Sequence, residues 1–135
     1  TVLNDTVYTF AANVSTAQSN THTVTIPFTS QGANHSNFLV EIYASLNWAA
    51  GASTTFAGRA LYTLNTFTSV SNVAELEDVN NSNLSFSATS SGMDFIVTIT
   101  TTATAGQEPD RIGVMAKVIR GNGSVGNEPI SMTIA

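Results

Sequence analysis

Apolar and polar residues alternate with a period of two along most of this chain. The clearest examples are residues 37–46 (NFLVEIYASL) and 93–102 (MDFIVTITTT). Because successive side chains of a β-strand point to opposite faces, this period predicts strands rather than helices. We expect strands at residues 6–12, 22–28, 37–46, 57–66, 83–89, 93–102, 111–120 and 129–134.

Turn-forming residues separate these segments, mainly at 30–36, 47–56, 104–110 and 121–128. Pro27 has no backbone N–H, so its strand either lies at a sheet edge or ends there. Segment 70–81 is ambiguous, since a strand followed by a loop is favoured and a short helix is the alternative. The clearest hairpin spans 83–102, and the side chains we expect to face the core are Phe86, Phe95, Val97 and Ile99.

Eight or nine short strands without a crossover helix favour an all-β fold. Strand pairs are expected to be antiparallel, because parallel pairs need long connections. We therefore predict one antiparallel β-sandwich domain over residues 1–135, with a jelly roll as the simplest arrangement.

Strands 37–46 and 111–120 carry apolar side chains on both faces. A sandwich strand needs only one apolar face, so the second face requires cover by loops or by another copy of the chain. We favour an oligomer interface, formed by Leu39, Tyr43, Met115 and Ile119. The charges on and near these strands, such as Glu41 and Lys117, are expected to be solvated at a rim or paired inside that interface.

Composition narrows the possible functions. Nine acidic and four basic residues give a net charge of −5, which argues against nucleic-acid binding because that needs a basic surface. Cysteine is absent, and no apolar run is long enough for a membrane helix, so we expect no disulfide and no membrane insertion. Without a leading signal segment, the chain is expected to be a mature or excised piece.

The chain contains no recognisable catalytic or phosphate-binding motif, so we expect neither an enzyme nor a cofactor. Its two histidines, His22 and His35, are expected to be surface polar residues. An acidic cluster around Glu75 and Asp78 does not match a calcium-loop spacing, so we predict no metal site.

Carbohydrate binding is the best chemical candidate. A sugar site combines an aromatic platform with neutral hydrogen-bonding groups, and Trp48 stands beside Asn47 before a loop rich in Gly, Ser and Thr. The alternative is a Trp48 side chain that caps the core or an interface. Ser, Thr and Asn together make up 48 of the 135 residues.

The phrases FLVEIY at 38–43, AGRALY at 57–62 and PDRIGV at 109–114 resemble strands from the distal knob of bacteriophage tail fibres or tail needles. The resemblance spans most of the chain. It implies a jelly-roll or tumour-necrosis-factor-like sandwich, a homotrimer, a place on the virion surface, and attachment to a host-surface receptor, often a glycan. No stalk precedes residue 1, which an excised piece would explain.

Two other functions remain open at this point. One is a stand-alone carbohydrate-binding module or adhesin domain, which we expect to be monomeric. The other is a structural capsid or decoration protein, which we expect to assemble into larger particles.

Overall fold

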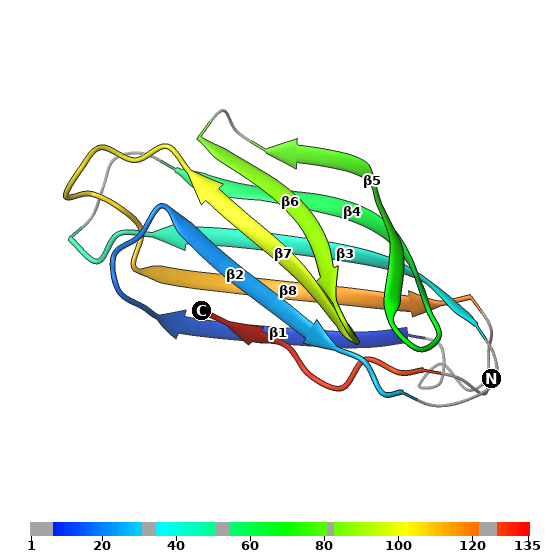
Figure 1. Cartoon of the computed structure of the whole chain (residues 1–135). Helices are drawn as coiled ribbons and strands as arrows, with labels where there is room; N and C mark the ends of the chain where they lie inside the picture. The colour runs from blue at the N-terminus through cyan, green and yellow to red at the C-terminus, as the bar shows by residue number, and fades with distance from the viewer. Residues whose placement is uncertain (1–6, 31–34, 51–54, 81–82, 122–126) are drawn as a thin grey trace.

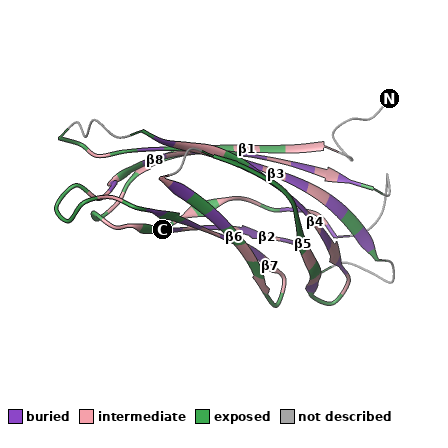
Figure 2. Cartoon of the chain, turned by 90° about the horizontal axis from the view of Figure 1, so that it is seen from above, coloured by how far each residue is buried: buried purple, intermediate pink, exposed green. Residues whose placement is uncertain are grey.

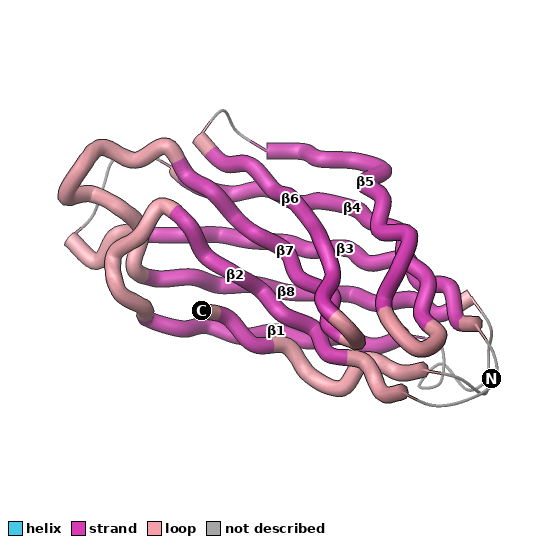
Figure 3. Tube along the Cα trace, in the orientation of Figure 1, coloured by secondary structure: helices cyan, strands magenta, loops and turns pink. Residues whose placement is uncertain are grey.

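A computed structural model of the chain describes residues 7–30, 35–50, 55–80, 83–121 and 127–135. The described residues form strands, turns and loops but no helix (Figure 3). The strands are β1 (Val7–Ser15), β2 (Thr21–Pro27), β3 (Ser36–Asn47), β4 (Phe56–Thr66), β5 (Val70–Asn80), β6 (Leu84–Ser91), β7 (Asp94–Thr101), β8 (Arg111–Arg120) and β9 (Thr133–Ile134).

The strands form two sheets packed face to face (Figure 1). One sheet has the order β1-β8-β3-β4-β5, the other has the order β6-β7-β2-β9, and every pair is antiparallel. The predicted antiparallel β-sandwich is confirmed. Strand β1 pairs with β8, and β2 pairs with β7. Because β2 and β7 both lie between β1 and β8 in the chain, the second pair is nested within the first, as in a jelly roll. Strands β3, β4 and β5 follow one another within one sheet.

The core lies between the sheets and is filled by alternate residues of the long strands, as the burial bands in Figure 2 show. On β3, Phe38, Val40 and Ile42 are buried, whereas their neighbours point outward. The hairpin prediction is confirmed, because the four side chains expected in the core are at most 7% exposed. Ser91 pairs with Asp94 across a two-residue turn, where Gly92 adopts a positive φ of 58° that favours glycine.

Segment 70–81 contains strand β5, so the helix alternative is wrong. The helix alternative would place Val70 and Leu76 on one buried face, but Val70 is buried in the core while Leu76 is 58% exposed. The strand also takes an extra residue there, since Tyr62 pairs with Glu75 and Leu61 pairs with Glu77. Leu76 is therefore the extra residue of a β-bulge on the edge of the five-stranded sheet.

The two histidines differ in burial. His35 is exposed and stacks on the ring of Phe67, with 4.6 Å between ring centroids. His22 is only 1% exposed, so its expected surface position is wrong. Its side chain lies on the inward face of β2, like those of Val24 and Ile26, and its Nε2 lies 2.9 Å from the Ser19 carbonyl oxygen.

Burial of the imidazole lowers the pKa of His22 from its ordinary value of 6.5. The unfolded chain therefore binds this proton more readily than the folded one, and the stability that neutral His22 contributes is lost as the pH falls below 6.5. We expect the melting temperature to fall between pH 7.5 and pH 5 more in the parent than in His22→Gln. An equal fall in both proteins would contradict this role.

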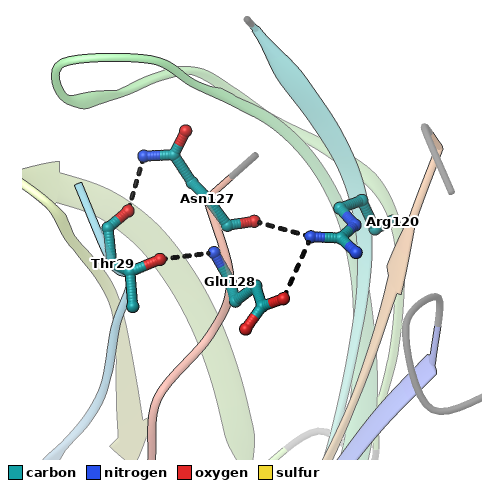
Figure 4. A network of polar contacts seen from close by, with 4 residues as sticks. All are labelled: Thr29, Arg120, Asn127 and Glu128. Carbon is teal, nitrogen blue, oxygen red and sulfur yellow. Dashed lines mark hydrogen bonds and ion pairs between the residues drawn. The ribbon is translucent and has the colours of Figure 1, made fainter. Parts of the chain in front are cut away.

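At the end of the sandwich where β8 finishes, a buried polar network connects the C-terminal segment to both sheets (Figure 4). Arg120 Nη1 lies 3.4 Å from the Asn127 carbonyl oxygen and 3.6 Å from Glu128 Oε1. The Asn127 amide nitrogen donates to the carbonyl oxygens of Thr29 and Phe67. Thr29 Oγ1 accepts from the backbone N–H of Glu128 at 2.9 Å.

Candidate functional site: the outward face of the five-stranded sheet

The four predicted interface residues lie together on the outward face of the five-stranded sheet. Leu39 is the cross-strand partner of Ile119, and Tyr43 is the partner of Met115. Met115 is 40% exposed, and the other three are half-buried. This proximity follows from the antiparallel register of β3 and β8. The use of these residues in an interface stays a prediction.

An open groove of about 710 Å³ crosses this outward face, and we call it the central groove. Its floor is low because one cross-strand row consists of small or short side chains, whereas the adjacent row carries Met115, Tyr43 and Arg59 as a wall. The low row is Asn13, Gly113, Ser45 and Ala57. The described lining is Ala11, Ala12, Asn13, Tyr43, Ala44, Ser45, Ala57, Gly58, Arg59, Val79, Asn80, Gly113, Val114 and Met115.

Two lining glycines allow close contacts between neighbouring strands: Gly113 lies in the low row of the central groove, whereas Gly58 faces inward like its partner Ala44. A Cβ atom on Gly58 would stand 2.7 Å from the Asn80 Cβ and 2.8 Å from the Val79 carbonyl oxygen. A Cβ atom on Gly113 would stand 2.6 Å from the Asn13 Oδ1. All three distances are shorter than real Cβ atoms tolerate, so larger residues would displace β5 or the Asn13 side chain.

A smaller and more polar depression continues the central groove toward the end of β3, and we call it the rim hollow. It has a volume of about 300 Å³ and shares Asn13, Ser45 and Gly113 with the central groove. Asn47 and Arg111, which are cross-strand partners, complete its polar wall with Ser15. The predicted binding residue Asn47 therefore lies in a depression lined by neutral amides, hydroxyls and one guanidinium group.

Trp48, the other predicted binding residue, is half-buried directly after β3. Its neighbour Ala49 donates its backbone N–H to Asp110 Oδ1 at 2.8 Å, which holds this loop against the β7–β8 connection. Trp48 is not among the described residues that line the rim hollow. The structure thus brings Trp48 to the same end of the sheet as Asn47 but not into the same depression.

A line of polar contacts crosses the outward face from β3 to β5. The Tyr43 hydroxyl donates to Glu41 Oε2 at 2.5 Å, and Arg59 Nη2 lies 2.8 Å from Glu77 Oε1. The Tyr43 hydroxyl and then the Glu77 charge raise the pKa of Arg59 above its ordinary value. Within one copy of the chain, Arg59 is therefore paired with Glu77, and Glu41 accepts its hydrogen bond from Tyr43.

Positive charge is concentrated on this face. Three of the four cationic side chains of the chain, Arg59, Arg111 and Lys117, stand on its outward positions, and the fourth, Arg120, is buried. Among the described acidic residues, only Glu41 and Glu77 share the face. The face therefore carries three cations against two carboxylates, although the whole chain has a net charge of −5.

This chemistry suits binding by hydrogen bonds and apolar contact. Within the part of the chain that the structure describes, the central groove and rim hollow are lined by no carboxylate or imidazole. All the residues that the structure describes contain no group of three His, Cys, Asp or Glu side chains that could hold a metal ion. They also include no helix that could span a membrane.

The sequence predicted the outward apolar residues but not the grooves. Each groove depends on which small residues become cross-strand neighbours, and this requires the register of four strands. The only signal in the sequence was the set of small residues at outward parity, namely Ala11, Ser45, Ala57 and Gly113.

Neither a protein-family model nor a curated protein matches the chain. Among solved structures, the fold is similar to part of the tailspike protein of Acinetobacter baumannii phage AM24, with a TM-score of 0.50 and 12% identity. That match covers 92% of this chain and 28% of the tailspike chain. The tailspike protein of Acinetobacter phage vB_ApiP_P1 matches with a TM-score of 0.43 and 10% identity, over 93% of this chain and 21% of that one. The chain thus spans about a quarter of the length of these tailspike proteins, and the AM24 likeness concerns the fold.

Proposed function

We propose that the chain is an attachment domain of a phage tail protein, exposed on the virion, that binds a host-surface glycan without cleaving it. The observation that carries the proposal is the rim hollow, whose polar lining includes Asn47 and Arg111, on a sandwich whose fold is similar to part of a phage tailspike protein. The amides and hydroxyls of the rim hollow can bind sugar hydroxyls, and the proposed assembly leaves this end of the sandwich accessible.

Binding without hydrolysis is the second part of the proposal. Most glycosidases place two carboxylates on either side of the scissile bond. The described lining of both depressions instead offers amides, hydroxyls and guanidinium groups. These groups donate and accept hydrogen bonds, but they supply neither the acid nor the nucleophile of that reaction.

The third part of the proposal is assembly as a homotrimer through the outward face. Leu39, Tyr43, Met115 and Ile119 form two apolar cross-strand pairs there, and burying them would remove apolar area from water. Lateral contact through this face leaves the end of the sandwich near Asn47 and Trp48 available to a receptor. In static light scattering, the parent should have three times the mass of the 14.1 kDa chain.

A panel of immobilised bacterial capsular and O-antigen polysaccharides tests glycan binding. We expect the parent to bind at least one of them, and Asn47→Ala or Trp48→Ala to weaken that binding about ten-fold, the effect of losing one good contact of 1–2 kcal/mol. Ser85→Ala, an exposed change on β6 of the other sheet, is the matched control and should bind like the parent. Release of reducing ends from a bound polysaccharide would contradict the non-enzymatic part of the proposal.

A further inference from the structure

Strand β5 is an exposed edge of the five-stranded sheet. All residues from 74 to 80 are exposed, including two large apolar side chains, Leu76 at 58% and Val79 at 49%. The same stretch carries the carboxylates of Glu75, Glu77 and Asp78. An exposed edge strand that bears large apolar side chains is a typical contact site for another chain.

The part of the outward face over β1, β8 and β3 has the complementary character. It holds the part of the central groove beside Met115 and Tyr43, although the groove also reaches Val79 and Asn80 of β5, and next to this part stand Lys117 and Arg111. Among the described residues, neither of these two cations is in an ion pair, whereas Arg59 is already paired with Glu77. Glu41, the cross-strand partner of Lys117, is the carboxylate on this part of the face, so two cations stand beside the apolar recess against one carboxylate.

Charge decides how two copies can meet. Contact between two outward faces would gather Lys117 and Arg111 of both copies, and contact between two β5 edges would gather their carboxylates. Like charges brought together oppose association, whereas an acidic edge on a cationic face is favourable. A head-to-tail contact is thus the arrangement that the charges favour.

We propose that strand β5 of one copy docks on the outward face of the next copy, with Leu76 entering the central groove beside Met115 and Tyr43. This geometry rests on the proposed assembly and specifies which surfaces meet. Because the contact joins β5 of one copy to β3 and β8 of the next, it is heterologous and repeats from copy to copy until a ring closes.

A charge at the tip of the edge tests this contact. Leu76→Asp should change the mass in solution from that of the assembly to that of one 14.1 kDa chain, without changing the melting temperature of the isolated fold, since Leu76 is already exposed. The matched control is Ile130→Asp, which changes a side chain of equal exposure, 57%, outside both surfaces. The control should keep the mass of the parent.

Mixing two defective variants tests the head-to-tail geometry directly. Leu76→Asp retains an intact face, and Met115→Asp retains an intact edge, so each should be monomeric alone. Mixed together, with one isotopically labelled, they should form a one-to-one dimer in native mass spectrometry. The intact edge of Met115→Asp can dock on the intact face of Leu76→Asp, and the two remaining surfaces are both defective.

The outcomes separate the two proposals. A monomeric parent would contradict the proposed assembly and this contact together. An oligomeric parent whose mass is unchanged by Leu76→Asp would overturn the contact alone. Failure of the mixture to give a one-to-one dimer would likewise overturn the head-to-tail arrangement.

Discussion

Replacement of Phe95 by alanine is expected to lower the free energy of unfolding by roughly 3–5 kcal/mol. Phe95 lies on β7 with no exposed surface, and its ring packs against the Tyr62 ring at 5.6 Å between centroids in an edge-on arrangement. These two rings join the two sheets, so truncation leaves a cavity at the middle of the core. Urea unfolding monitored by circular dichroism measures the loss.

The control for this substitution is Phe67→Ala, the same truncation at a half-buried position that contacts His35. It should cost clearly less, because part of the Phe67 ring is already in water. A Phe95→Ala protein that melts within about two degrees of the parent would show that the β6–β7 register is incorrect.

Asn127→Ala is expected to lower the free energy of unfolding by about 2–3 kcal/mol. The fully buried amide donates to the carbonyl oxygens of Thr29 and Phe67, and buried acceptors that lose their donors are costly. Hydrogen exchange should also become faster at the Ala135 amide, which bonds to the Thr23 carbonyl oxygen, because the segment that follows Asn127 loses its anchor.

Asn37→Ala is the matched control for the buried amide. Asn37 is exposed, and its side chain accepts one hydrogen bond from the Asn65 amide at 2.7 Å on the surface. Water can replace that contact, so the expected change is within about 0.5 kcal/mol. Equal losses for Asn127→Ala and Asn37→Ala would mean that the network of Figure 4 contributes little to stability.

Strand positions and the faces of their residues could be predicted from the sequence because both follow from a local period of two. The same period also identified the inward residues of β8, from Ile112 to Val118. When the alternation of β8 is extended by one step, Arg120 falls on the inward face. When the alternation of β2 is extended back toward its start, His22 falls on the inward face. We expected His22 at the surface because it is polar, yet strand parity outweighs polarity where a hydrogen-bond partner is available.

Features that depend on neighbours distant in the sequence could not be predicted. The bulge at Leu76 depends on how β5 pairs with β4, and the central groove depends on the alignment of Asn13, Gly113 and Ser45 on three different strands. Trp48 illustrates the same limit. Its place after a strand was evident, but its separation from the rim hollow depends on how the loop after β3 is held by Asp110.

The nested pairing of the strands has a consequence for synthesis of the protein. Strand β1 pairs along its whole length with β8, so that Val7 faces Ile119, and β2 pairs along its whole length with β7. Strands β1 and β2 leave the ribosome before β7 and β8 and must therefore remain without these partners until β7 and β8 have been made, whereas β3, β4 and β5 can pair as they emerge. Contacts of such long sequence separation fold slowly, on the order of milliseconds to seconds. During that interval, the edge of β3 that later binds β8 is open, and a ribosome that stops before residue 111 releases a sheet whose β3 edge has no β8 to cover it.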